Sequence, residues 1–415
     1  MMTTTHIGAL YVGRFFIGCA NGWFMTHSQL YLQECSPARY RGLFISGFQF
    51  FTSFGTLIGT VVDNQTAPIA GRNAYLIPLG VIYILPFFMS ICMIFIPETP
   101  RWLLLQNRAE DARKSLLWLR PNPDAVETEL AEIQAALEIE QRHAKGASIM
   151  QLFNNPVDRR RTFLSVASVS CQAASGAMFM IAYKTYFLQM SGTDKPFMYS
   201  VIQSAAGCTV ILLNSCIIVR YGRRRVFLTC GMAICGIAQL AVALVYDKQS
   251  RTKATGRAIV GLSTMYLVTY NGAVASYAWL AGGEIPSQRL RSYTFGLAAA
   301  LGFLGAWLAT FTAPYFINPD SLGWGPKYGY IWFPSCIVTS LWVFLFLPET
   351  KGRTLEEINE MFEQRLPARK FRGYKCTGLG TATPGDGKDR TSFEEDGVLD
   401  EKAAATVQVT AATGS

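Results

Sequence analysis

Long stretches almost free of charge constrain this chain more than any other feature of its sequence. Only 16% of its 415 residues are charged, whereas soluble domains carry about a quarter. A helix that crosses about 30 Å of hydrocarbon needs roughly 20 mostly apolar residues. Nine segments meet this test: 7–30, 43–62, 75–96, 163–189, 198–219, 226–246, 257–282, 293–316 and 329–347. The sequence therefore predicts an all-α integral membrane protein.

The charges that remain lie mainly between these apolar segments. A net charge of +9 would be compatible with nucleic acid binding, but the Lys and Arg residues do not gather on one basic face. An excess of positive charge in cytoplasmic loops explains them better. The ten Cys residues are scattered without a metal-type spacing and are interpreted as small buried residues. We expect no nucleic acid partner, no metal and no cofactor.

The basic loops also predict the orientation of the chain. Arg residues recur in alternate short connections: 35–42, 220–225 and 284–292. These loops share a side with the charged segment 97–162 and with the C-terminal tail, so this side is predicted to be cytoplasmic. The loop 247–257, on the other side, is an exception because it holds four basic residues. A sequon at Asn64 falls on the outer side, where glycosylation occurs.

A repeat at an offset of about 250 residues relates two parts of the sequence. Glu34 precedes Arg41 by seven residues, and Glu284 precedes Arg291 by seven. Pro-Glu-Thr then begins 63 residues after Glu34, at 97–99, and 64 residues after Glu284, at 348–350. Ordered markers at nearly equal spacing indicate two related halves, as in many transporters.

The repeat also predicts a missing piece. The second half contains six predicted spans and the first half only three. The Gly222-Arg223-Arg224 turn lies 62 residues before Glu284, so its first-half counterpart would fall upstream of Met1. We therefore expect the chain to lack about its first three helices, through a truncated gene model or a genuine short isoform.

The marker residues resemble those of one transporter family, the sugar-porter branch of the major facilitator superfamily, over nearly the whole chain before the tail. The matching motifs are 13–14, 34–42, 97–102, 222–224, 284–291 and 348–353. Tyr183–Phe187 and Glu284–Arg291 are most similar to the fungal α-glucoside (maltose-type) permeases. The resemblance implies a two-half helical bundle, N-terminally truncated to about nine transmembrane helices, that alternates access to a sugar site near the midplane.

The same resemblance divides the chain into four parts. Residues 1–96 are expected to form a partial N-terminal half with helices 4–6. Residues 97–162 form a cytoplasmic central loop with short helices, and 163–347 form the six-helix C-terminal half with helices 7–12. Residues 348–415 form a cytoplasmic tail, which we expect to be disordered after about 371 because it is rich in Gly, Thr, Ala and acidic residues.

A sugar has polar edges and weakly apolar faces, so its site needs amide or hydroxyl side chains and an aromatic plate. The resemblance assigns substrate contacts to Gln49 on helix 5, to Gln172 and Tyr183 on helix 7, and to Trp279 on helix 10. The alternative for each is a polar side chain bonded to a neighbouring helix or an aromatic side chain at the lipid interface.

Departures from the family pattern bear on the substrate. The second Gln of the hexose-type helix-7 motif is Ala173 here, and its usual Asn is Met178. The Gly-Pro that precedes the helix-10 aromatic is replaced by Ala275-Ser276. These departures argue against a simple hexose site and favour a larger or less polar substrate.

Arg14 is the most informative single charge, because a guanidinium inside a span is costly and normally has a partner. In proton-coupled members of the family this position pairs with an Asp on helix 1, so the resemblance makes Arg14 a proton-coupling candidate. The alternative is that the span begins after Arg14, whose side chain then reaches the membrane surface.

A second group of charges lies at the predicted cytoplasmic helix ends. It comprises Glu34, Arg41, Glu98, Arg101, Arg224, Glu284, Arg291 and Glu349. Partly solvated ion pairs are worth only about 0–1 kcal/mol each, but several together bias a two-state equilibrium. The repeated spacing favours a charge latch between conformations over charges that only set orientation.

These features predict a monomeric, multi-pass carrier in the plasma membrane that moves a sugar of the α-glucoside/maltose or hexose type through the lipid bilayer, with proton symport left open. The alternatives are a membrane nutrient sensor of the same fold and an inactive truncated transporter. The short tail favours transport over sensing. The sequence holds no enzyme motif such as a P-loop or GxSxG, and it does not identify the sugar.

Overall fold

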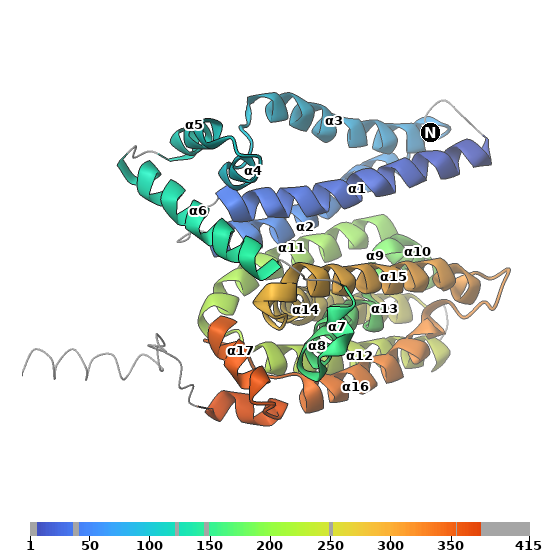
Figure 1. Ribbon diagram of the computed structural model, residues 1–415. Helices are drawn as coiled ribbons and strands as arrows, with labels where there is room; N and C mark the ends of the chain where they lie inside the picture. The colour runs from blue at the N-terminus through green and yellow to red at the C-terminus, as the bar shows by residue number, and fades with distance from the viewer. Residues whose placement is uncertain are drawn as a thin grey trace, which may run out of the picture. The chain divides into compact units, whose positions relative to one another are not determined.

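The computed structural model describes residues 6–35, 41–120, 124–144, 149–248, 252–353 and 355–374. Within these ranges the chain forms helices and no strand (Figure 1). Two compact units, Met1–Leu347 and Pro348–Ser415, are described separately. The all-α architecture predicted from the apolar segments is therefore confirmed for the described part of the chain.

Three long helices open the first unit: α1 (Ile7–Cys35), α2 (Arg41–Thr66) and α3 (Asn73–Phe95). Each contains one predicted span almost completely. Helix α2 packs along α11 and also contacts α1 and α3. None of the residues of α3 is buried, so its side chains face outward, as those of a lipid-facing helix do.

The segment 97–162 forms the predicted short helices: α4 (Pro100–Leu105), α5 (Ala109–Leu119), α6 (Asp124–Ala144) and α7 (Gln151–Asn154). Thr99 begins α4, since its Oγ1 accepts a hydrogen bond from the Trp102 backbone N–H at 3.2 Å and Pro100 occupies the first helical position, a favoured N-terminal arrangement. Leu103, Leu116 and Val126 form a small core between α4, α5 and α6.

The rest of the first unit is a helical bundle. Its elements are α8 (Pro156–Ala174), α9 (Ala177–Ala182), α10 (Lys184–Met190), α11 (Pro196–Tyr221), α12 (Arg224–Lys248), α13 (Lys253–Thr269), the π-helix η1 (Tyr270–Ala275), α14 (Ser276–Glu284), the 3₁₀ turn η2 (Gln288–Leu290), α15 (Arg291–Ile317), the 3₁₀ turn η3 (Gly325–Tyr328) and α16 (Gly329–Phe346). Helix α12 packs against α13 and α16, and α8 packs against α14 and α15.

The predicted span 163–189 is wrong as a single helix, because the structure divides it into α8, α9 and α10. Gly176 has φ = 76°, a left-handed conformation that ends a helix and that glycine adopts without steric cost. A Cβ atom built on Gly176 would lie 2.6 Å from the Trp332 ring. Glycine is therefore required here both by the backbone and by the close approach of α16.

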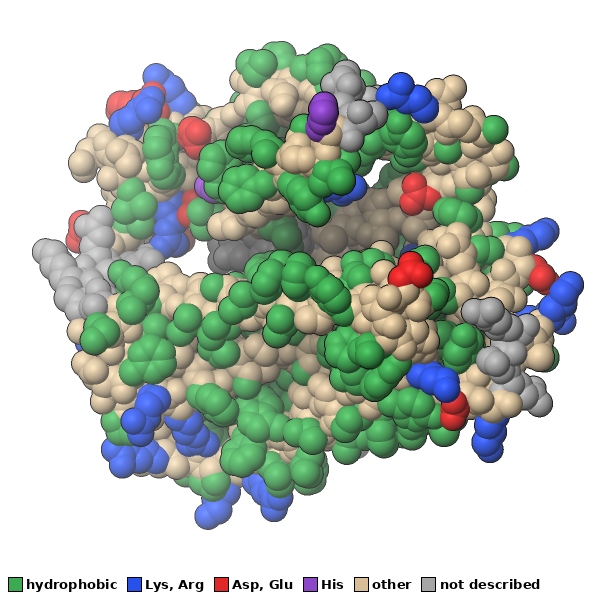
Figure 2. Space-filling view, turned by 90° about the vertical axis from the view of Figure 1, so that its right-hand side faces the viewer, with side chains coloured by type: hydrophobic (Ala, Val, Ile, Leu, Met, Phe, Trp, Pro, Cys, Tyr) green, Lys and Arg blue, Asp and Glu red, His purple; other side chains and the backbone are tan. Residues whose placement is uncertain are grey.

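Six helical stretches are long and apolar enough to cross a membrane: Asn73–Phe95, Pro196–Asn214, Arg224–Lys248, Lys253–Glu284, Arg291–Ile317 and Gly325–Phe346. They overlap six of the nine predicted spans. The other three correspond to α1, α2 and the broken series α8–α10, so the count of nine stays a prediction. Hydrophobic side chains cover broad areas of the face in Figure 2, while Lys and Arg lie mainly toward its margins. The length and apolar composition of the six stretches are what fit a protein that spans a membrane.

The second unit contains α17 (Leu355–Glu363) and the 3₁₀ turn η4 (Ala368–Gly373). The Phe362 and Phe371 rings meet edge to face at 5.1 Å, and Arg353 Nη2 donates to the Tyr374 carbonyl at 2.6 Å. These contacts hold the turn against the helix. Residues 375–415, most of the segment for which disorder is predicted, lie outside the described residues.

Candidate functional site

The π-helix η1 lies in the middle of one long span, Lys253–Glu284. A π-helix inside an α-helix is rare and is often found at functional sites. Glycines allow neighbouring helices to approach it closely: a Cβ on Gly231 of α12 would lie 2.8 Å from Ala273, and one on Gly272 would lie 2.9 Å from Val210 of α11. The irregular backbone of η1 is thus enclosed by α11 and α12.

Helix α8 is fastened to this irregular span at two levels. Ser165 Oγ donates to the Gly282 carbonyl at 2.7 Å, and Gln172 Nε2 donates to the Ala275 carbonyl at 2.9 Å. The two donors are seven residues apart along α8, and the two acceptors are also seven residues apart but follow in the opposite order along the chain. The two helices therefore run antiparallel, and the two hydrogen bonds fix their register. Gln172, a predicted substrate contact, therefore bonds to a neighbouring helix at the end of η1.

Trp279 lies one helical turn after Ala275, at about 6 Å of axial rise, and is half-buried. Its ring contacts two aromatic side chains of α15, Phe295 at 5.8 Å and Phe303 at 5.9 Å between centroids. The structure thus places Trp279 near Gln172 along one helix pair and gives it aromatic neighbours on a third helix.

Tyr183 stands at the junction between α9 and α10. Its hydroxyl donates to the Thr310 carbonyl of α15 at 3.4 Å, and its ring stacks on Phe179 with 6.4 Å between centroids. Helix α15 therefore contacts both Tyr183 and Trp279. The Tyr183 hydroxyl, the Gln172 amide and the Trp279 indole come from separate segments, and each contacts η1 or α15.

A cavity of about 380 Å³ opens beside Ala173, the residue that follows Gln172. Its lining is largely apolar and includes Leu308, Phe316 and Trp332, with Thr312 as a polar member. Pockets for small molecules commonly have a volume of about 300–1,000 Å³. A Gln at position 173 would extend into this space, so Ala173 leaves it larger and less polar.

The two remaining predicted contacts lie on the first helices. Gln49 is half-buried on α2, and Arg14 is exposed on α1. The hydrogen bonds that position Gln172 and Tyr183 involve neither of them. Asn64, the glycosylation candidate, lies near the end of α2 at Thr66.

Among the charges of the proposed latch, the structure pairs Arg224 at the start of α12 with Glu284 at the end of α14. Arg224 Nη2 lies 2.7 Å from Glu284 Oε1, and Nε lies 3.2 Å from Oε2, a bidentate geometry with directional strength. The two side chains are 14% and 19% exposed, so water still reaches the pair.

The other latch residues are distributed differently. Glu34 and Glu98 both act electrostatically on the Cys35 thiol, whose pKa is raised mainly by burial, so these carboxylates lie near the same end of α1. Arg101 is half-buried and Arg291 is exposed. The Arg41 side chain lies outside the described residues. Glu349 belongs to the second unit, where its Oε1 accepts from the Lys351 backbone N–H at 3.3 Å.

Arg120 is a structural charge that sequence reasoning missed. Its guanidinium donates to Glu129 Oε2 at 2.8 Å and to the Cys35 carbonyl at 3.0 Å, which joins the end of α1 to α5 and α6. The hydrogen bond to Glu129 raises the pKa of Arg120. No local motif marks this arginine, because its partners are 9 and 85 residues away.

Lys184 is a second charged residue that the sequence analysis did not identify as a candidate. It is 7% exposed at the start of α10, its Nζ donates to Ser204 Oγ of α11, and it interacts electrostatically with Asp63 of α2. Beside it, Thr185 and Ser200 hydroxyls lie 2.9 Å apart. The signal was present in the sequence, because an ionisable residue inside a predicted span marks a candidate functional position.

Comparison with known proteins places these features in a family. Residues 1–362 match the sugar (and other) transporter family. The general alpha-glucoside permease of Saccharomyces cerevisiae is 31% identical over 370 residues, which cover 87% of this chain and 59% of the permease. The high glucose sensor RGT2 of the same species is 29% identical over 365 residues, which cover 86% of this chain and 47% of the sensor. The chain thus spans about half the length of these relatives.

Among solved structures, the chain is similar to the major facilitator superfamily proton:xylose symporter XylE of E. coli, bound to 6-bromo-6-deoxy-D-glucose. The match has a TM-score of 0.61 at 20% identity and covers 81% of this chain and 70% of that chain. This likeness shows the major facilitator fold. With a family match over most of its length and this helical fold, the chain belongs to the sugar (and other) transporter family of membrane proteins.

Proposed function

We propose that this chain carries a sugar across the membrane by alternating access. The observation that carries the proposal is the arrangement of Gln172 against Ala275, one turn from Trp279, in a member of the sugar transporter family. Amide and aromatic groups of this kind suit the polar edges and the apolar faces of a sugar ring. The name of the permease relative supports an α-glucoside as substrate, and a hexose is the alternative.

The proposed domain assignment follows the family order. Residues 1–96 serve as helices 4–6, 97–162 as a cytoplasmic loop and 163–347 as helices 7–12, with 348–415 as a cytoplasmic tail. The protein acts as a monomer in the plasma membrane, with Asn64 glycosylated on the outer side. The six apolar helices of suitable length support this assignment, as does the position of Asn64 at the end of α2.

In the proposed site each side chain has a distinct role. Gln172 has a carbonyl oxygen that can accept a sugar hydroxyl while its amide N–H₂ bonds to Ala275. Trp279 supplies the aromatic plate, Tyr183 closes the site from the α9–α10 junction, and Gln49 contributes from α2. The apolar cavity beside Ala173 supports a substrate larger or less polar than a hexose.

The predicted latch charges would control the change between the outward-open and inward-open conformations. We assign the Arg224–Glu284 pair to a latch that is closed in this structure, with the remaining latch residues contributing at the same membrane surface. Arg14 is the proton-coupling candidate on α1. If protons are cotransported, uptake by the unsubstituted chain increases as external pH falls, and this is measured at two pH values.

The test is uptake of radiolabelled maltose, other α-glucosides and hexoses by transport-null cells that express the chain. Gln172→Ala is expected to abolish uptake without loss of surface protein. Gln239→Leu is the matched control: Gln239 is 1% exposed in α12, and its Nε2 has no hydrogen-bond partner. Unchanged uptake by Gln172→Ala, or equal loss in both variants, would remove Gln172 from the site.

A membrane sensor of the same fold is the second candidate, because the high glucose sensor covers 86% of this chain at 29% identity. A sensor binds sugar and signals without moving it. Saturable binding of an α-glucoside to the purified protein, with no uptake in cells and no uptake in proteoliposomes, would favour sensing. Uptake that saturates with concentration would favour transport.

A further inference from the structure

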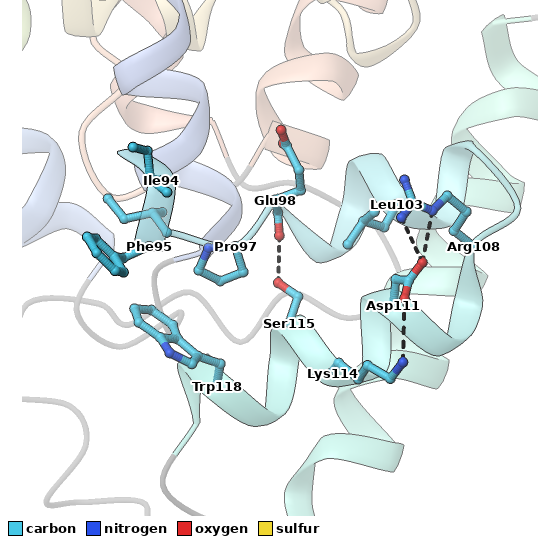
Figure 3. A pocket seen from close by; sticks show the side chains of 11 residues that line it. Ile94, Phe95, Pro97, Glu98, Leu103, Arg108, Asp111, Lys114, Ser115 and Trp118 are labelled. Carbon is cyan, nitrogen blue, oxygen red and sulfur yellow. Dashed lines mark hydrogen bonds and ion pairs between the residues drawn. The ribbon is translucent and has the colours of Figure 1, made fainter. Parts of the chain in front are cut away.

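A cavity of about 390 Å³ lies where α3 ends and the short helices α4 and α5 begin (Figure 3). Its position is unusual, because α3 is an apolar helix without buried residues whereas α5 carries charged side chains. The cavity therefore lies where a lipid-facing surface passes into a polar one. We call it the boundary cavity.

One side of the boundary cavity is apolar and exposed. Ile94 is 79% exposed, Phe95 73% and Trp118 64%, and Phe95 and Trp118 lie on the same side in Figure 3. Large apolar side chains at this exposure are disfavoured in water, while Trp is enriched at the membrane–water interface. This side thus suits contact with acyl chains and the glycerol region of a lipid.

The other side is a cluster of three charges on α5 and the turn before it. Asp111 Oδ2 lies 2.8 Å from Arg108 Nη2, and Asp111 Oδ1 lies 3.7 Å from Lys114 Nζ. Two cations and one carboxylate leave one positive charge. Glu98 also lines the cavity, but Figure 3 shows that its side chain points away from this cluster, and its backbone carbonyl accepts from Ser115 Oγ at 2.6 Å.

We propose that the boundary cavity binds the headgroup of an anionic phospholipid. The phosphodiester lies between Lys114 and Arg108, and its single negative charge neutralises the cluster. The acyl chains follow the exposed apolar surface at the end of α3, with Trp118 at the depth of the glycerol. A zwitterionic lipid fits less well, because its ammonium adds a second positive charge to a site that is already positive.

The existing ion pairs do not oppose this binding strongly. Lys114 is 75% exposed and Arg108 56% exposed, and exposed ion pairs contribute little stability because water screens them. Lys114 can turn from Asp111 to a phosphate at small cost. A basic residue near an anionic membrane surface is attracted to the lipid phosphates, so an anionic lipid competes with Asp111 for Lys114. The proposal is independent of the transported substrate.

The test uses the full chain in nanodiscs of phosphatidylcholine alone or of equimolar phosphatidylcholine and phosphatidylglycerol. Lipid retained after transfer to detergent is measured by native mass spectrometry. Wild type is expected to retain phosphatidylglycerol, and R108Q/K114Q to retain about 5- to 30-fold less, since about 1–2 kcal/mol is lost. R113Q is the control, because Arg113 lies on α5 but pairs with Glu127 and does not line the cavity.

Equal retention of phosphatidylglycerol by wild type and R108Q/K114Q would overturn the proposal, as would preferential retention of phosphatidylcholine by wild type. A second measurement separates a lipid from a free phosphate ligand. Brominated phosphatidylglycerol should quench the tryptophan fluorescence of wild type more than that of W118F, because the bromine atoms lie near Trp118. Added glycerol phosphate should not reverse this quenching. Relief by glycerol phosphate would mean that the cavity binds phosphate without the lipid.

Discussion

The helices α1–α3 and the bundle α8–α16 differ sharply in packing, although both consist of membrane-type sequence. Half of the apolar window of α12 is buried, while none of that of α3 is. Polar side chains in the first region bond mostly within their own helix, as Thr56 does to Thr52 and Ser90 to Pro86. In the second region many also bond across helices, as Ser165 does to Gly282 and Ser335 to Ala174.

This contrast teaches that hydropathy and packing are separate properties of a membrane helix. Apolar composition is enough to place a helix in lipid, but fixed side-chain positions come from bonds and contacts between helices. Gln172 and Tyr183 have such bonds, so their places are defined. The roles of Gln49 and Arg14, in the first region, rest on the family resemblance alone.

The largest difference between the two regions is expected for glycine substitutions. Gly176→Ala puts a side chain into a left-handed conformation, which costs about 1–2 kcal/mol, and forces its Cβ to within 2.6 Å of the Trp332 ring. Overpacking costs about 1–3 kcal/mol more. We therefore expect Gly176→Ala to lower stability by about 2–5 kcal/mol, measured by thermal unfolding in detergent.

Gly59→Ala is the matched variant in α2. No atom lies within 4 Å of a Cβ built on Gly59, and Ala is the better helix former by about 1 kcal/mol. The melting temperature should be unchanged or slightly higher. Similar destabilisation by both substitutions would show that the first region is packed as tightly as the second, contrary to the comparison.

Ion pairs give the next largest effect. Arg224 and Glu284 join two helices of the bundle, while Arg120 and Glu129 join the short helices α5 and α6. Both pairs make two contacts and are at most 30% exposed, so each is stronger than a fully exposed pair, which is worth about 0–1 kcal/mol. Loss of a charge-assisted hydrogen bond costs about 1.5–3 kcal/mol, and Arg224→Gln and Arg120→Gln should therefore both reduce stability. Only Arg224→Gln should also slow uptake, because we place only that pair in the latch.

Charge reversal tests whether pairing itself matters. Arg224→Glu combined with Glu284→Arg should recover part of the uptake that either single reversal abolishes. If uptake falls in proportion to stability in Arg224→Gln and Arg120→Gln alike, the Arg224–Glu284 pair is structural and the latch assignment is wrong.

The fold was predictable because its signals are local or repeated. Twenty-residue apolar segments define most helices, and the spacing from Glu34 and from Glu284 to the two Pro-Glu-Thr motifs indicated two halves. Glu284 and Arg224 were placed in one group of charges for that reason, and the structure brings them together. The short amphipathic helices of 97–162 also followed from sequence pattern.

The details of the site could not be predicted in the same way. The helix break at Gly176 and the π-helix Tyr270–Ala275 depend on neighbouring helices that approach from elsewhere in the chain. Gln172 and Ala275 are 103 residues apart, and a single sequence does not reveal which backbone carbonyl an amide meets. The resemblance assigned a substrate contact to Gln172, but it did not predict that Gln172 of α8 would donate a hydrogen bond to the end of η1.

The smallest expected effect is the coupling between the two regions through Lys184 and Asp63. These side chains interact electrostatically, yet the direct partner of Lys184 is the Ser204 hydroxyl. Lys184 is buried but Asp63 is exposed to solvent, and a charge pair without direct contact and with one exposed member is expected to couple by about 0–1 kcal/mol. Lys184→Met, Asp63→Asn and the double variant form a cycle in which the costs of the single changes, including the lost Ser204 bond, cancel.

Thermal or denaturant unfolding of the four proteins measures this coupling free energy. A coupling of a few tenths of a kcal/mol, reduced by added salt because exposed charges are screened, would mean that α2 and α10 interact through a long-range charge contact. A coupling above about 2 kcal/mol would instead indicate a desolvated pair. The two regions would then be joined by a specific ionic contact. The first region has few side-chain bonds between helices and the second has many, and this difference would not hold where α2 meets α10.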